Sequence, residues 1–350
     1  MLLDPWGGVR RVPSFGARPG ALPDPARSGP SAPFREHRMN RSALHPVRRA
    51  NPVAGFVRAH PLGAFLAWFF TVGQALAFVP VIGREVYGVD VPGQPFVVAS
   101  TLVGLLLPAL VITGIVDGPQ GLRALWARAV HVRIPLRWYA LALIGVPAAT
   151  VALTVALFGA PQLTAATLAS ALGYGLVLQF FVVLLSNNWW EELAWMGFVQ
   201  ARLQERHGPA RAAVVVGPLF ALQHVSLVVG NSLVLGAVFM VALALVAIPF
   251  RALQGWVYNS TGSLFAVALV HAAGNAAASG SGFAGGGGFL TRIYDEPLVG
   301  SMQTLASAVL GLLVLAATRA RLGRPSRRPV DDVPTPSGAA PARATVGGPR

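Results

Sequence analysis

The sequence predicts an all-α, polytopic membrane protein with about eight transmembrane helices, and three observations favour this fold class. Of the 350 residues, 54% are hydrophobic and only 11% are charged, and the mean hydropathy is +0.59, which is too apolar for a soluble globular surface of this size. Apolar runs near the length that crosses a hydrocarbon core of about 30 Å recur along the chain. The basic residues gather in the tails and between those runs.

The chain opens with a polar segment. Residues 1–58 are rich in Arg, Pro and Ser and have no apolar periodicity. Such a composition cannot bury a core, so we expect a disordered cytoplasmic tail, with Met39 as an alternative start. The first apolar run begins after His60, which does not fit a secretory signal peptide.

Eight apolar runs then form a predicted transmembrane domain at 59–320. The runs cover about 61–83, 96–116, 138–159, 168–190, 212–229, 233–250, 261–279 and 300–318. Each approaches the ~20 residues that a span requires at 1.5 Å per residue, although the two runs between 212 and 250 are short. The segment 321–350 is rich in Pro, Arg and Ala and is predicted to be a second disordered cytoplasmic tail.

The arginines predict the orientation of these spans. All 27 basic residues are arginine, a bias that a GC-rich bacterial genome explains. Cytoplasmic loops hold the excess of basic residues in membrane proteins. With both termini in the cytoplasm, only Arg84 and Arg292 lie outside, whereas Arg202, Arg251 and the other arginines lie inside. We therefore expect an even number of spans in the bacterial inner (cell) membrane.

Two connecting segments have distinct compositions. In the inner segment 117–137, Leu122, Leu125, Trp126 and Ala129 recur at helical spacing between arginines, so we expect a helix along the cytoplasmic interface. The outer segment 279–299 contains SGSGFAGGGGF, which lacks the lysine of a phosphate-binding loop and is predicted to be a connector. Membrane orientation explains the net charge of +14 better than a nucleic-acid partner does. The chain has no cysteine, which excludes disulfides, thiolate catalysis and cysteine-ligated metals.

Two adjacent glutamates end the fourth apolar run. Glu191 and Glu192 follow Trp190 directly, and no other acidic residue occurs between Asp117 and Glu205. A carboxylate at membrane depth costs roughly 2.5–3.5 kcal/mol on insertion scales, so an intramembrane pair indicates a functional site.

Three runs bring polar groups to similar depth. At helical rise from the expected membrane edges, Glu191 lies ~16 Å deep, His224 ~20 Å and His271 ~15 Å. His271 and Asn275 share one helix face at i, i+4 spacing. Glu191 and Glu192 point about 100° apart, so one can do chemistry while the other pairs with a helix or orients the first. We expect these groups to converge on one site.

These residues resemble the motifs of the CPBP intramembrane proteases, a family also called ABI that includes the type II CAAX prenyl endopeptidases. EELAWMGF (191–198) is similar to the family's EExxxR pattern, FALQH (220–224) to FxxxH, and HAAGN (271–275) to HxxxN, in the family's order. The approach GWVYNSTGSLFAVALVHAAGN (255–275) is similar as well. The resemblance covers a core at about 168–280, and the flanking spans match only in hydropathy.

The resemblance implies an intramembrane endopeptidase. Glu191 with His224 would activate the water that attacks a peptide carbonyl, and His271 and Asn275 would stabilise the oxyanion, where loss of one donor typically costs ~3–4 kcal/mol. Glu192 would support this site or orient the substrate. The family has also been described as metalloproteases, because a set such as Glu191, His224 and His271 can bind zinc with an open position. Water activated by Glu and His and water activated by a divalent metal both stay open.

One position departs from the family motif. The arginine of EExxxR falls at position 196, where this chain has Met196. The glutamates then lack the cation that their motif would supply. Either another arginine, such as Arg202 or Arg251, reaches the pair, or one glutamate is protonated, or catalysis is weakened.

Two other function classes stay open. A proton- or cation-coupled transporter could use buried Glu and His side chains, although the first and last four spans share no motif pairs that would indicate a repeat. A protease-like scaffold could bind membrane peptides without cutting them, and Met196 keeps this alternative open. In every reading the partners are the lipid bilayer and, for the protease, a peptide or protein segment; in a bacterium we do not expect prenylated tails.

Structural roles compete with each functional assignment. The glutamates could be solvated at a helix end beside Trp189 and Trp190, and the histidines and Asn275 could form interhelical polar contacts. Phe220 is interpreted as packing. Asn187 and Asn188 are interpreted as residues solvated at a helix end, and a role in lining a polar cavity is the alternative.

Overall fold

The computed structural model describes residues 51–229, 232–280 and 287–323, and within these ranges the chain is helical and has no strand. Six helical stretches are long and apolar enough to cross a membrane; they are Pro61–Tyr87, Gly93–Val116, Leu136–Phe158, Ala165–His207, Leu233–Thr261 and Pro297–Ala317. Two further apolar helices, Pro209–Leu222 and Leu264–Ala277, are shorter. The all-α membrane fold is therefore confirmed, and each of the eight predicted runs contains a helix, but only six of these helices have spanning length.

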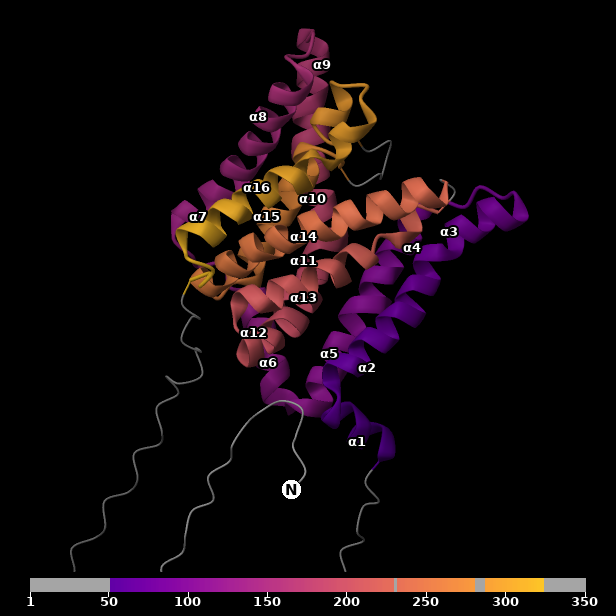
Figure 1. Ribbon diagram of the computed structural model, residues 1–350, viewed down its shortest axis with the longest axis vertical. Helices are drawn as coiled ribbons and strands as arrows, with labels where there is room; N and C mark the ends of the chain where they lie inside the picture. The colour runs from indigo at the N-terminus through magenta and orange to yellow at the C-terminus, as the bar shows by residue number, and fades with distance from the viewer. Residues whose placement is uncertain (1–50, 230–231, 281–286, 324–350) are drawn as a thin grey trace, which may run out of the picture. The chain divides into compact units, whose positions relative to one another are not determined.

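The first two spans form a close antiparallel pair (Figure 1). The first consists of α2 (Pro61–Trp68), the π-helical η1 (Phe69–Gly73) and α3 (Gln74–Tyr87), and it follows α1 (Pro52–Ala59) inside the predicted N-terminal tail. The second consists of α4 (Gly93–Ala99), the π-helical η2 (Ser100–Leu106) and α5 (Leu107–Val116). The pair approaches closely because two glycines meet: a Cβ on Gly104 would lie 2.5 Å from Cα of Gly73.

The inner segment after the second span contains the predicted helix. It is α6 (Gly118–Ala129), and it buries Leu125 and Ala129 while Trp126 stays 53% exposed. One face therefore packs on the bundle, as the helical spacing predicts. The third span follows as α7 (Leu136–Ala140), the π-helical η3 (Leu141–Gly145) and α8 (Val146–Phe158).

The fourth span is one continuous helical stretch of 43 residues. In order, it contains α9 (Ala165–Ser170), η4 (Ala171–Leu178), α10 (Gln179–Val183), η5 (Leu184–Asn188), α11 (Trp189–Ala194), η6 (Trp195–Gln200) and α12 (Ala201–His207), of which the η segments are π-helical. The prediction that this span ends near 190 is wrong. Glu191 and Glu192 begin a run of ten buried residues that ends at Gln200, so a solvated helix end does not explain the pair. The hydropathy pattern places the end of the span at the glutamates because a hydropathy value treats every carboxylate as polar, whether or not buried partners neutralise it.

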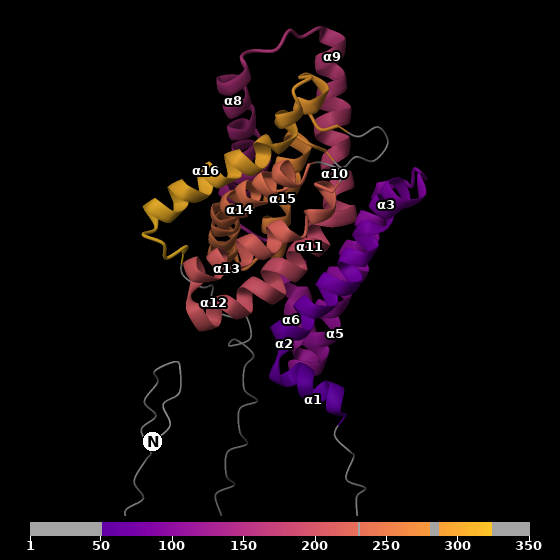
Figure 2. The ribbon, with the colours of Figure 1, turned by 45° about the vertical axis from the view of Figure 1, so that its right-hand side comes forward.

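The remaining helices pack around α14. They are α13 (Pro209–Leu222), the 3-10 turn η7 (Val225–Leu227), α14 (Leu233–Thr261), α15 (Leu264–Ala277), the 3-10 turns η9 (Leu290–Arg292) and η10 (Pro297–Ser301), and α16 (Met302–Ala317). In both views α14 lies between α13 and α16 (Figures 1 and 2). The predicted end of the sixth span near 250 is wrong, because the helix continues through Arg251, which the arginine distribution had assigned to an inner loop.

Small residues let α13 and α16 approach α14 just before Arg251. A Cβ on Gly217 of α13 would lie 2.7 Å from the backbone nitrogen of Ile248, and a Cβ on Gly311 of α16 would lie 1.9 Å from the carbonyl oxygen of Pro249. Such backbone contacts are typical of membrane helices, whose association depends on close packing. They hold this turn of α14 in place, and with it the arginine that follows.

Candidate active site

Glu192 is fully buried and has three side-chain partners. Arg251 of α14 donates from Nη1 to both carboxylate oxygens, at 3.0 Å and 2.9 Å. The amide of Gln254, one turn further along the same helix, donates at 2.9 Å, and Nδ1 of His271 on α15 lies 2.8 Å from Oε1. Three helices therefore meet at this carboxylate, which leaves little of it free for chemistry.

Arg251 is the cation of the site. Its side chain is 0% exposed. Its Nε donates to Oε1 of Gln200 at 3.0 Å, and the amide of Gln200 donates in turn to the carbonyl of Arg251 at 3.1 Å. The guanidinium carbon lies 5.4 Å from the ring centroid of Phe220. Among the described residues, Nη2 of Arg251 has no hydrogen-bond partner. Of the two arginines named as substitutes for position 196, Arg251 reaches the glutamates, whereas Arg202 pairs with Asp117.

Glu191 has a separate set of partners. Gln223 donates from Nε2 to its Oε1, and Asn188 donates from Nδ2 to its Oε2 at 3.2 Å. Gln223 is itself held, because its Oε1 accepts from the indole of Trp195 at 2.5 Å and its carbonyl accepts from Gln74 at 3.1 Å. The side chain of Glu191 is 6% exposed, and its two hydrogen-bond partners are neutral amides, while Nδ1 of His271 lies 3.9 Å from its Oε2.

A chain of amides leads to Glu191 from α16. Gln303 donates to Oδ1 of Asn275 at 3.4 Å, Asn275 donates to Oδ1 of Asn188 at 3.2 Å, and Asn188 donates to Glu191. A carboxylate only accepts, so each amide must direct its NH2 group toward the next member. This chain fixes the direction of the Asn275 side chain. It uses one N–H of Asn275 and leaves the other for a further acceptor.

Both histidines are anchored through Nδ1. His224, just beyond the end of α13, has Nδ1 3.1 Å from the carbonyl of Phe220, and His271 has Nδ1 bound to Glu192. A carbonyl and a carboxylate are acceptors, so both Nδ1 atoms carry a proton. In the described part of the chain, Nε2 of neither ring has a hydrogen-bond partner. These two nitrogens are therefore the free ends of the site.

Aromatic rings enclose the histidines. The ring of Phe220 lies 5.2 Å from His224 and 6.0 Å from His271, and Phe250 lies 5.4 Å from His271. Trp195 closes the same wall at 6.2 Å from Phe220. Phe220 thus packs, as the sequence analysis interpreted it, and its packing contacts both imidazoles. Such a wall lowers the local polarity, which strengthens interactions between the charges behind it.

The predicted site residues lie together in the structure. Nδ1 of His271 is 2.8 Å from Glu192 and 3.9 Å from Oε2 of Glu191, and the ring of Phe220 packs against both His224 and His271. His224 reaches this place after its helix has ended, although the sequence had placed it inside a span.

Sequence reasoning named Arg251 as one of two arginines that could reach the glutamates, although the arginine distribution assigned it to an inner loop. Asn188 was interpreted mainly as a residue solvated at a helix end. Gln223, Gln254 and Gln303 were not singled out at all. Their one signal is polarity in an apolar region, since Gln223 sits inside FALQH and Gln254 directly precedes the stretch similar to the family's last motif.

The predicted zinc ligands are Glu191, His224 and His271. Among residues 51–229, 232–280 and 287–323, no cluster of three or more His, Asp or Glu side chains is arranged to hold a metal ion. Both carboxylate oxygens of Glu191 accept from amides, and the imidazoles offer Nε2 alone. Zinc binding by Glu191, His224 and His271 therefore stays a prediction.

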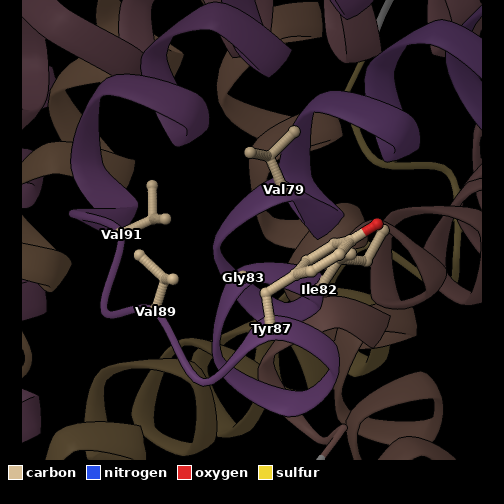
Figure 3. A pocket seen from close by; sticks show the side chains of 6 residues that line it. All are labelled: Val79, Ile82, Gly83, Tyr87, Val89 and Val91. Carbon is tan, nitrogen blue, oxygen red and sulfur yellow. The ribbon is translucent and has the colours of Figure 1, made fainter.

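Two cavities in the described part of the chain lie apart from this site. One, of about 330 Å³, is at the end of α3 and the loop after it, where Val79, Ile82, Tyr87, Val89 and Val91 surround Gly83 (Figure 3). The other, of about 300 Å³, is an apolar groove between α8, η4 and the end of α15. Neither is lined by an ionisable group that would work near neutral pH, so neither competes with the buried cluster as a catalytic site.

The comparison with known families agrees with the motifs. Residues 173–277 match the family model described as type II CAAX prenyl endopeptidase Rce1-like. This match confirms the resemblance inferred from the sequence and spans all five predicted site residues, from Glu191 to Asn275. Arg251 also lies within the match, whereas Gln303 lies beyond it. No curated protein matches the chain significantly.

Proposed function

We propose that this protein is an intramembrane endopeptidase that cleaves a peptide bond with water activated by Glu191 and His224. The single observation that carries the proposal is the pair of anchored imidazoles. Each has its Nδ1 fixed and its Nε2 free; His271 lies 2.8 Å from Glu192 and 3.9 Å from Glu191, and Gln223, which directly precedes His224, binds Glu191. Such a set can accept a proton, donate one and bind an oxyanion, and peptide hydrolysis requires all three.

The proposed reaction needs two proton transfers. Water gives a proton to Glu191 while its oxygen bonds to the substrate carbonyl carbon, and the carbonyl oxygen becomes an oxyanion. His224 helps to orient that water, because its Nε2 is a lone-pair acceptor when Nδ1–H is bound to Phe220. The C–N bond then breaks as Glu191 passes this proton to the leaving nitrogen. The products are a carboxylic acid and an amine, and transfer of the acid's proton to the amine gives a carboxylate and an ammonium group.

His271 serves the oxyanion as a donor in this scheme. To donate from Nε2 while Nδ1–H stays on Glu192, its imidazole must be protonated. Arg251 and protonated His271 then balance Glu191 and Glu192, so the buried cluster is neutral before the reaction. The second N–H of Asn275, which the amide chain leaves free, supplies the other donor. Preorganised donors of this kind stabilise the transition state without reorganisation.

The substrate class follows from the location of the site. A buried cluster within a bundle of apolar helices is reached by a peptide or by a protein segment at the membrane, from the bilayer or from the cytoplasmic side. The arginine distribution supports insertion in a bacterial inner membrane with both termini in the cytoplasm.

Cleavage by the purified protein in proteoliposomes tests the proposal. Quenched-fluorescence peptides with and without a C-terminal farnesyl group are the probes, and Glu191→Gln is the comparison. We expect hydrolysis by the natural chain and a loss of about 10²–10⁴-fold in the variant, the usual contribution of a general base. Unchanged cleavage by a well-expressed Glu191→Gln protein would contradict the mechanism.

The same preparation separates the alternatives. Peptide binding without hydrolysis would favour the scaffold, and a proton flux lost in Glu191→Gln would favour transport. A chelator followed by zinc addition tests the metal: activity that disappears and returns would assign the water to a metal ion held by Glu191, His224 and His271.

A further inference from the structure

The position of the motif arginine is occupied by a core residue. Met196 lies four residues after Glu192, about one helical turn away, and its side chain is completely buried in the main apolar cluster. No charge reaches the glutamates from this position. The charge arrives instead from α14, where Arg251 places Nη1 within 3.0 Å of both oxygens of Glu192.

We infer that Arg251 is the positioning residue of the site and replaces, from another helix, the arginine that position 196 lacks. The inference rests on the proposed function and deepens it. Arg251 does not touch the reacting atoms; it holds the Glu192 carboxylate, which holds Nδ1 of His271 at 2.8 Å. The free Nε2 of His271 is thereby aimed at the place where an oxyanion would form.

The surroundings of Arg251 fit a positioning role. Nε is bound to Gln200 while Nη1 is bound to Glu192, so the planar fork contacts two positions eight residues apart on the fourth span at once. The ring of Phe220, which also packs on both histidines, lies against the guanidinium. Lysine has a single nitrogen at its tip and cannot reproduce two directed contacts from one rigid plane. Rotation of Glu192 is therefore controlled by Arg251 more than by Gln254, which makes one neutral contact.

Relocation of the arginine tests the inference. The variants are Arg251→Met, Arg251→Lys, Met196→Arg and the double variant that combines Arg251→Met with Met196→Arg. Methionine and arginine have unbranched stems, and position 196 shares a helix face with Glu192, so the double variant returns the cation to the motif position. Arg202→Met is the matched control, because that arginine pairs with Asp117 outside the site.

Peptide cleavage is the first readout. We expect Arg251→Met to lose about 10–100-fold in kcat, the usual effect of removing an outer partner of a catalytic group. Arg251→Lys should recover part of this loss and the double variant most of it, whereas Arg202→Met should cleave normally. A folded Arg251→Met protein with normal cleavage would overturn the inference. So would a double variant that regains the melting temperature but not the activity, because Arg251 would then be structural only.

Histidine labelling is the second readout and does not depend on activity. Diethyl pyrocarbonate acylates accessible neutral imidazoles, so labelling is measured over a pH series and compared at its alkaline plateau, where the rings are neutral, and mass spectrometry locates the modified residue. We expect labelling of His271 to rise in Arg251→Met and to fall again in the double variant. His224 is the internal reference, since its anchor is the Phe220 carbonyl. Unchanged labelling of His271 would contradict the inference.

The two readouts keep the proposals distinguishable. If the natural chain cleaves no probe, the endopeptidase proposal fails, and the labelling still decides whether Arg251 fixes Glu192 and His271. If Arg251→Met does not fold, Arg251→Lys and the double variant test the inference instead, because each retains a cation. A folded double variant that neither cleaves the peptide nor protects His271 from labelling would refute the positioning role of Arg251.

Discussion

Glu191 and Glu192 are neighbours in sequence but belong to different hydrogen-bond networks. Glu192 is bound by Arg251, Gln254 and His271, whereas the hydrogen bonds to Glu191 within the described residues come from the amides of Asn188 and Gln223, with His271 further away at 3.9 Å. The helix directs adjacent side chains about 100° apart, so one pair of residues supplies two carboxylates in different surroundings. One carboxylate is fixed by a cation, and the other keeps its charge available for a proton.

Because of this division, the two glutamine substitutions should affect stability differently. Glu192→Gln leaves Arg251 buried without a charged partner, so we expect a loss of about 3–5 kcal/mol in the free energy of unfolding. Glu191→Gln exchanges one hydrogen bond for a donor–donor contact with Asn188, and we expect a loss of about 1 kcal/mol. Unfolding of each variant in detergent, followed by tryptophan fluorescence, measures both. Equal losses would mean that the two carboxylates are not divided in this way.

The amide chain predicts a role for Asn188. Replacing it with alanine removes the donor to Glu191 and the acceptor for Asn275. We expect kcat to fall about 10–100-fold with KM little changed, because the substitution disturbs two groups that act on the transition state. Asn187→Ala is the control: it changes the preceding amide, whose Oδ1 has no partner among the described residues. Comparable kcat losses in both variants would contradict the relay.

Gln303 extends the same argument beyond the matched region. It lies on α16 and is the only described side chain that donates to Oδ1 of Asn275. Gln303→Leu keeps a similar volume but lets the Asn275 amide rotate, so we expect a kcat loss smaller than that of Asn188→Ala. Steady-state kinetics on the peptide probe give the comparison. A larger loss for Gln303→Leu would place the substrate contact at α16 itself.

Hydropathy predicted the helices of this fold because each apolar run must be helical to satisfy its backbone in lipid. The motif residues were predicted as well, since ionisable groups are rare in such runs. The ends of the fourth and sixth spans were not. Both predictions stopped at a charged residue, Glu191 in one and Arg251 in the other. Both charged residues belong to the site, where Arg251 pairs with Glu192, the residue next to Glu191.

The amides of the site escaped prediction for a different reason. Asn188, Gln223 and Gln303 carry no charge, and their residue types are common at helix ends and in loops. Their role in the site depends on partners that are distant in sequence. Gln303 on α16, for example, binds Asn275 on α15. Only tertiary packing brings these groups together, so the local sequence pattern does not predict their contacts.

Single cysteines can test the predicted orientation, because the natural chain has none. Glu85→Cys lies at the exposed end of α3, and Arg123→Cys lies on the exposed face of α6, at opposite ends of the first two spans. With both termini in the cytoplasm, a membrane-impermeant maleimide should label position 85 in intact cells and position 123 only after permeabilisation. The reverse pattern would invert the topology and move the predicted cytoplasmic tails outside.

The close approach of α16 to α14 predicts how the scaffold supports Arg251. A Cβ at Gly311 would lie 1.9 Å from the carbonyl oxygen of Pro249, two residues before Arg251, so Gly311→Ala must push α16 and α14 apart. We expect a loss of about 1–3 kcal/mol in the free energy of unfolding, the usual result of overpacking. Cleavage should fall as well, because a displaced α14 moves Arg251 away from Glu192 and α16 carries Gln303. Gly173→Ala is the matched control, since a Cβ there meets nothing within 4 Å. If both alanine variants unfold and cleave alike, the contact at Pro249 does not position the site, and Arg251 is held by its partners Gln200 and Glu192 alone.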